Sequence, residues 1–147
     1  MLKGIPKILS PELLKVLAEM GHSDRLVIAD GNFPAESMGK NAIVVRCDGH
    51  GVPELLDAIL QVFPLDTYVE QPVNLMEVMP GDPVETPIWD TYKEIVKKHD
   101  ERGEKAVGNI ERFAFYEEAK TAYAIIATGE SAVYANVMLQ KGVVVTE

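Results

Sequence analysis

The sequence predicts a three-layer α/β fold in which a largely parallel central sheet is flanked by helices. Short apolar runs typical of buried strands alternate with longer segments whose apolar residues recur at the spacing of amphipathic helices. This alternation along a chain is characteristic of parallel sheets. No internal repeat or linker interrupts the 147 residues, so we expect one domain over residues 1–147.

The expected helices have recognisable ends. Ser10 can cap the first one, Pro11 fits its first helical position, and Gly21 follows its last residue. Pro64 ends the second helix, because the residue before a proline is driven away from helical geometry. We expect helices over residues 11–20, 53–63 and 89–99, and a shorter one over residues 117–122.

The clearest strands are two apolar runs, Arg-Leu-Val-Ile-Ala-Asp at residues 25–30 and Tyr-Ala-Ile-Ile-Ala-Thr at residues 123–128. Gly31 and Asn32 follow the first run as a turn signal. We expect further strands over residues 41–46, 73–79 and 136–139, and a weaker one over residues 106–113.

Charge and composition exclude several classes of function. The net charge is −9, from 23 acidic and 14 basic residues, which argues against nucleic acid or an anionic membrane surface as partner. No stretch approaches the roughly 20 apolar residues of a membrane span, and residues 1–10 carry no run of signal-peptide length. Cys47 is the only cysteine, so neither an internal disulfide nor a thiolate metal site can form. We expect a cytoplasmic protein without a metal.

His22 and Asp30 are the first candidate site residues. His22 comes directly after the first helix, and Asp30 ends the strand at residues 25–30, the position where ligands bind in open α/β sheets. Spacing alone also allows plainer roles, a helix-terminal histidine and a turn-forming aspartate. If the intervening stretch were fully extended, the two would lie about 20–25 Å apart. They can share a site only if the loop folds back or neighbouring subunits supply them.

A second group of candidates lies nearer the C-terminus. Arg112 and Tyr116 belong to an aromatic block, and aromatic faces with a few polar groups suit sugar rings. Core aromatics beside a surface arginine would give the same pattern. Tyr134 and Asn136 offer a phenol and an amide that can bind hydroxyl groups.

Nine ordered blocks of residues make the sequence resemble the RbsD/FucU family over almost its whole length, and its fucose branch most closely. The blocks are Leu-Lys-Gly-Ile-Pro at 2–6, Ser-Pro-Glu-Leu-Leu at 10–14, Met-Gly-His at 20–22, Ala-Asp-Gly-Asn-Phe-Pro-Ala at 29–35, Arg-Cys-Asp-Gly at 46–49, Pro-Leu-Asp-Thr-Tyr-Val at 64–69, Thr-Pro-Ile-Trp at 86–89, Arg-Phe-Ala-Phe-Tyr-Glu at 112–117 and Ala-Thr-Gly-Glu at 127–130.

The resemblance implies an RbsD-like fold and a site. His22 matches the general acid/base of the family, and the sugar-binding positions match Asp30, Arg112, Tyr134 and Asn136, with Tyr116 added for ring contact. Ala135 stands where the family has a glycine, which would be costly if that residue needs a positive φ. Family members form ring-shaped homo-oligomers, commonly decamers, with sites at subunit interfaces.

The implied function is an L-fucose mutarotase that interconverts the α and β anomers of a free monosaccharide. Ring opening of a hemiacetal needs no cofactor, only a group that exchanges protons near neutral pH, and histidine has an unperturbed pKa of about 6.5. A ribose pyranase with the same chemistry and a non-catalytic sugar-binding protein are the alternatives.

Overall fold

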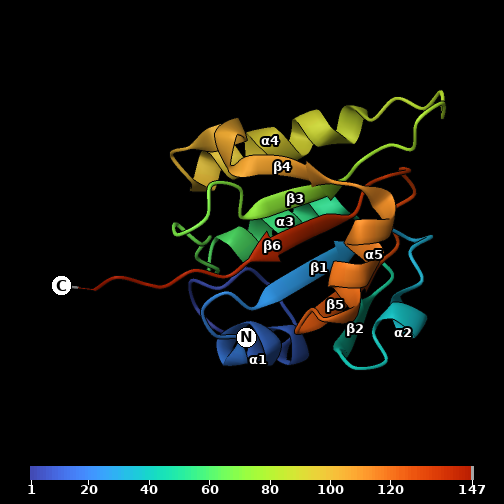
Figure 1. Cartoon of the computed structure of the whole chain (residues 1–147). Coiled ribbons are helices and arrows are strands. Elements are labelled where there is room, and N and C mark those ends of the chain that lie inside the picture. Colours follow the sequence, from blue (N-terminus) through green and yellow to red (C-terminus); the bar gives the residue numbers. More distant parts are fainter. Residues whose placement is uncertain (147) are drawn as a thin grey trace.

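A six-stranded sheet lies between two layers of helices in the computed structural model, which describes residues 1–146 (Figure 1). The strands are β1 (Arg25–Ala29), β2 (Ile43–Cys47), β3 (Val73–Met76), β4 (Val107–Ile110), β5 (Ala124–Thr128) and β6 (Val137–Gln140). Their order in the sheet is β2-β5-β1-β6-β3-β4, and only β6 runs antiparallel to its two neighbours. The expected three-layer fold with a largely parallel sheet is confirmed.

The helices cover both faces of this sheet. They are α1 (Pro11–Glu19), α2 (Ala35–Met38), α3 (Val52–Leu60), α4 (Pro87–His99) and α5 (Arg112–Lys120), with a short 3-10 helix, η1, at Gly103–Ala106. Helices α1, α3 and α4 pack on one face, and α2 and α5 pack on the other (Figure 1). No helix in the described part of the chain is both long and apolar enough to cross a bilayer.

Strand β1 shows how the sequence builds the two layers. Leu26 and Ile28 point into the core formed with α1, α3 and α4, whereas Val27 and Ala29 point into the core formed with α2 and α5. All four side chains are fully buried. A strand buried on both faces needs a continuous apolar run, which is why this strand was recognisable in the sequence.

Local signals placed the first helix correctly. The Ser10 hydroxyl accepts a hydrogen bond from the Leu13 amide at 3.1 Å, and Pro11 is the first helical residue.

Two other elements have different ends from those expected. Helix α4 begins at Pro87, two residues before the expected start, and β3 ends at Met76, three residues before its expected end.

The aromatic block was placed wrongly. We expected residues 106–113 to be a strand and a helix to begin at residue 117, but β4 ends at Ile110 and α5 begins at Arg112. The Glu111 carboxylate caps the helix by accepting the Ala114 amide at 3.0 Å. This cap outweighs the strand preference of the aromatic residues. The four-residue helix α2 was not expected, because it is too short to show a periodic pattern.

Candidate active site

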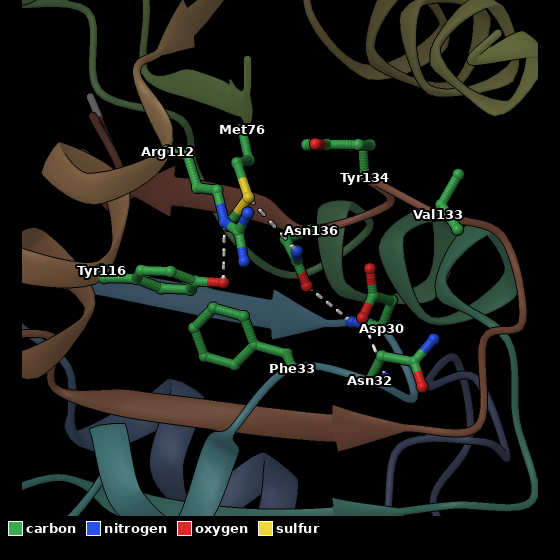
Figure 2. Close-up of a pocket in the computed structure, with 9 residues that line it drawn as sticks. All are labelled: Asp30, Asn32, Phe33, Met76, Arg112, Tyr116, Val133, Tyr134 and Asn136. Atoms are coloured by element: carbon green, nitrogen blue, oxygen red, sulfur yellow. Dashed lines mark hydrogen bonds between the residues drawn. The ribbon is translucent and has the colours of Figure 1, made fainter. Parts of the chain in front are cut away.

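A cavity of about 240 Å³ opens at the carboxyl ends of β1 and β3 (Figure 2). Because β6 is antiparallel, its first residues lie at this same edge. The volume lies just below the range of roughly 300–1,000 Å³ for drug-sized ligands, so it suits a smaller molecule. The lining residues are Asp30, Asn32, Phe33, Met76, Arg112, Tyr116, Val133, Tyr134 and Asn136. Five of the six predicted site residues are therefore brought together.

Asp30 and Asn136 form a polar wall of this cavity. The Asp30 carboxylate accepts backbone hydrogen bonds from Asn32 at 3.0 Å and Ala135 at 3.3 Å, which fix its orientation. The Asn136 amide oxygen accepts the Asp30 backbone N–H at 2.8 Å, so the NH₂ group of Asn136 is turned away from that bond, towards Met76 Sδ. A carboxylate has room for further acceptor contacts. The wall thus offers an acceptor and a donor side by side, the combination that binds a hydroxyl pair.

Burial governs the protonation of Asp30. The residue is only 6% exposed, and burial raises the pKa of its carboxyl above the ordinary value. The hydrogen bonds from Ala135 and Asn32 act in the opposite direction but do not cancel this effect. An incoming hydroxyl donor would favour the charged form, because it solvates the carboxylate.

Arg112 and Tyr116 form the opposite wall, one turn apart on α5. Arg112 Nε donates to the Tyr116 hydroxyl at 3.2 Å, and the guanidinium carbon lies 5.6 Å from the centre of the Tyr116 ring. The Phe33 ring packs against Tyr116 with centroids 5.7 Å apart. The bond through Nε holds the guanidinium in place. Within residues 1–146 its two Nη groups make no hydrogen bond, so they can act as donors next to aromatic faces.

The backbone at residues 134–136 is fixed by helix α4. Trp89 Nε1 donates to the Tyr134 carbonyl at 2.8 Å, and the buried Tyr92 hydroxyl donates to the Ala135 carbonyl at 2.7 Å. Tyr134 has a φ of +52°, in the left-handed region, whereas Ala135 does not. Ala135, where the resemblance implied a glycine, is therefore not strained by a positive φ, and its side chain is fully buried. The Tyr134 hydroxyl lies 2.9 Å from Asp82 Oδ2 and donates to it.

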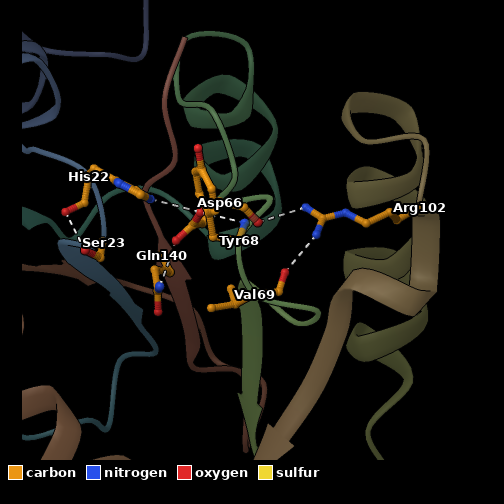
Figure 3. A network of polar contacts seen from close by, with 7 residues as sticks. All are labelled: His22, Ser23, Asp66, Tyr68, Val69, Arg102 and Gln140. Carbon is orange, nitrogen blue, oxygen red and sulfur yellow. Dashed lines mark hydrogen bonds and ion pairs between the residues drawn. The ribbon is translucent and has the colours of Figure 1, made fainter. Parts of the chain in front are cut away.

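His22 lies at the other end of β1 (Figure 3). It precedes this strand, whereas Asp30 follows it, and the five residues of β1 alone span roughly 15 Å at about 3.3 Å per residue. The imidazole is 41% exposed, its Nε2 is 3.1 Å from Asp66 Oδ1, and its ring is 5.1 Å from that of Tyr68. The loop does not fold back, so within one chain His22 is outside the cavity.

Comparison with known proteins identifies the family. The sequence model of the RbsD / FucU transport protein family matches residues 3–144. This chain belongs to the RbsD/FucU family. A fucose mutarotase from Homo sapiens is 50% identical over 146 residues, which cover 97% of this chain and 94% of that protein.

Solved structures of similar sequence have the same fold and support the family assignment. The crystal structure of FucU from Bifidobacterium longum is 72% identical, with a TM-score of 0.96, and the match covers 97% of this chain and 100% of that one. The fucose mutarotase from Streptococcus pneumoniae in complex with L-fucose is 49% identical, with a TM-score of 0.91, covering 98% and 100%. The resemblance to the RbsD/FucU family seen in the sequence is confirmed.

Several residues that line the cavity or contact His22 were not among the site residues predicted from the sequence of this RbsD/FucU chain. Phe33, Met76 and Val133 supply the apolar part of the cavity, and Asp66 holds the His22 ring. Phe33 lies just beyond the carboxyl end of the strand expected at residues 25–30, where a ligand site is expected, so its position was the available signal. Met76 had no such signal, because its strand was expected to continue to residue 79. Asp66 belongs to the block at residues 64–69, but nothing in the sequence connects it with His22, which is 44 residues away.

The hydroxyl of Tyr92 is expected to stabilise the fold. Tyr92→Phe leaves the buried Ala135 carbonyl without this donor, and the free energy of unfolding should fall by about 1–3 kcal/mol. Urea unfolding followed by circular dichroism measures the change. Tyr123→Phe is the matched control, since it removes an exposed hydroxyl bonded to Glu19, and no measurable change is expected. Equal stability of the two variants would contradict the role of Tyr92.

Proposed function

We propose that this protein is a mutarotase that interconverts the α and β anomers of free L-fucose. The observation that carries the proposal is the cavity in which Asp30, Asn136 and Arg112 converge beside aromatic faces. This arrangement matches a monosaccharide, whose hydroxyls need fixed donors and acceptors and whose C–H faces pack on rings. The names of the relatives point to the same sugar.

The chemistry requires only proton transfer. Opening of the hemiacetal removes a proton from the anomeric hydroxyl and delivers one to the ring oxygen, and closure on the other face of the aldehyde gives the other anomer. His22 is the proton carrier in this proposal, since histidine exchanges protons near neutral pH. Asp30, Arg112, Tyr134 and Asn136 bind the sugar, with Tyr116 contacting its ring. No cofactor takes part.

A homo-oligomer would complete the site. His22 is outside its own cavity, but its ring is half-exposed, and the adjacent Tyr68 ring is 75% exposed. We propose that this surface packs against the cavity of a neighbouring subunit, so that His22 of one chain serves the sugar bound by another. A closed ring, such as the decamer expected from the family, repeats this contact at every interface.

We place the enzyme in the cytoplasm, where an unpaired cysteine such as Cys47 stays reduced.

Anomer exchange measured by saturation-transfer NMR tests this function. Catalytic amounts of the protein should accelerate exchange between the anomers of L-fucose in proportion to protein concentration. D-ribose, measured in parallel, should respond less. Acceleration of pyranose–furanose exchange in ribose without any effect on fucose would favour a ribose pyranase. Fucose binding without faster exchange would leave a sugar-binding protein and contradict the proposal.

A further inference from the structure

A loop between β3 and α4 holds the side chain of Tyr134, which lines the cavity. The loop covers residues 77–86 and leaves the sheet directly after Met76, another residue of the cavity wall (Figure 1). The Met79 amide donates to the Tyr134 hydroxyl oxygen at 3.4 Å, and that hydroxyl donates to Asp82 Oδ2 at 2.9 Å. One short segment therefore engages the phenol both as an acceptor and as a donor.

The sequence of this segment builds a turn that brings the two contacting groups together. Pro80 and Gly81 occupy its central positions, and the Asp82 amide closes it by donating to the Met79 carbonyl at 3.1 Å. Gly81 has a φ of +85°, which is typical of the third residue of a type II turn and favours glycine. The Pro-Gly pair thus sets the spacing of Met79 and Asp82, the two residues that contact the Tyr134 hydroxyl.

The backbone of Tyr134 has an unusual conformation. Its φ of +52° is uncommon for a residue other than glycine, and such a conformation persists only where the surroundings hold it. The bond from the Trp89 indole to the Tyr134 carbonyl is one such contact. Figure 2 shows the Tyr134 side chain reaching from the end of β6 toward the side of the cavity where Met76 and Arg112 lie. The strained backbone therefore directs a side chain that belongs to the site.

The contact with Asp82 decides how the Tyr134 hydroxyl can meet a sugar. A phenol has one hydrogen to donate and two lone pairs that accept, whereas a carboxylate oxygen accepts. The Tyr134 hydrogen therefore points at Asp82, and the Met79 amide uses one lone pair. The second lone pair remains for a hydroxyl of the bound sugar, which would donate to it.

Asp82 also acts on the cavity through its charge. The pKa of the Arg112 guanidinium is raised, mainly by its hydrogen bond with Tyr116 and to a smaller extent by the negative charge of Asp82. The Asp82 side chain is exposed, and water and salt weaken interactions between exposed charges. We therefore expect the hydrogen bond to Tyr134, and not the charge, to matter for sugar binding.

We propose that Asp82 is a positioning residue, which orients the Tyr134 hydroxyl so that its oxygen accepts a hydrogen bond from the sugar. This inference rests on the proposed mutarotase function. Asp82 acts through Tyr134 and takes no part in proton transfer. Its loss should weaken the binding of fucose without slowing the chemical step.

Two substitutions of Asp82 test this role. Asp82→Ala removes the acceptor, and the Kd of L-fucose should rise about 2- to 10-fold, the usual effect of losing one hydrogen bond. Asp82→Asn keeps an acceptor oxygen and loses only the charge, so it should retain the Kd of the unmodified protein. Titration calorimetry measures the affinity. Saturation-transfer NMR at saturating fucose measures the exchange rate, which should not change in either variant.

Tyr134→Phe completes the test, because it removes the hydroxyl through which Asp82 acts. It should weaken fucose binding at least as much as Asp82→Ala does, and combining the two substitutions should cause no further loss. Glu85→Ala is the matched control, since it removes another exposed carboxylate of the same loop, outside the cavity lining, and should leave the affinity unchanged. Residues 79–82 belong to neither hydrophobic core, so the Asp82 variants should fold, which circular dichroism checks.

The outcomes separate this role from its alternatives and from the proposed function. Undiminished affinity in Asp82→Ala, or equal weakening in Asp82→Asn, would overturn the positioning role. A further loss in the double variant would show that Asp82 acts independently of Tyr134, which overturns it as well. An unmodified protein that binds fucose without accelerating its exchange would remove the mutarotase function, while the affinities would still decide the role of Asp82.

Discussion

Replacement of His22 by alanine is expected to lower the rate of L-fucose anomer exchange by about 10²–10⁴-fold, the contribution typical of a positioned proton-transfer group. The fold should tolerate the change, because the imidazole is half-exposed and contributes nothing to either hydrophobic core. Fucose affinity should change little, since the polar wall of the cavity does not include His22. Saturation-transfer NMR at saturating fucose measures the rate.

A second exposed histidine provides the control for this experiment. His50 has a side chain that is 46% exposed, and it pairs with Glu54 at 3.1 Å, much as His22 pairs with Asp66. His50→Ala should leave the exchange rate unchanged. Wild-type exchange in a folded His22→Ala variant would remove His22 from the mechanism.

Asp30→Asn is expected to weaken fucose binding by about 10- to 150-fold. This estimate follows from the roughly 1.5–3 kcal/mol of a hydrogen bond to a charged group and about 1.4 kcal/mol for each tenfold change in affinity. The amide keeps the size of the side chain but offers one acceptor in place of two. One of the two backbone amides now bonded to Asp30 would face an NH₂ group, which should also lower the free energy of unfolding by about 1–3 kcal/mol.

Titration calorimetry with L-fucose measures the affinity, and urea unfolding measures the stability. Asp48→Asn is the control, because Asp48 is an exposed carboxylate paired with Arg46 outside the cavity. Its fucose affinity should equal that of the unmodified protein. Undiminished affinity in Asp30→Asn would show that the carboxylate does not bind the sugar.

The sequence was most informative where local physics decides the structure. The continuous apolar run of β1 and the cap at Ser10 predicted their elements, and the position of Asp30 at a strand end predicted its place in the cavity. These features depend on neighbouring residues or on the general geometry of parallel sheets. The resemblance to the family then supplied Arg112 and Asn136, which spacing alone could not assign.

Features that depend on contacts distant in sequence were not predictable in this way. One local feature was also missed, the cap from Glu111 to the Ala114 amide that starts α5 at Arg112, because glutamate is not among the residues preferred at this position. Asp66 reaches His22 across 44 residues, and Met76 enters the cavity only because β6 lies between β1 and β3 and places both strands in one sheet. Such contacts follow from the folded topology and leave no periodic pattern in the chain.

In the proposed assembly, His22 of one subunit acts on a sugar held by Asp30 of another. Co-expression of His22→Ala and Asp30→Asn chains in equal amounts tests it directly, with fucose below the KM of the unmodified enzyme. Random assembly leaves about a quarter of the interfaces with both residues intact, since each interface draws its two halves independently. Exchange should therefore recover to about one quarter of the unmodified rate. A mixed assembly no more active than the average of its two parents would contradict the shared site.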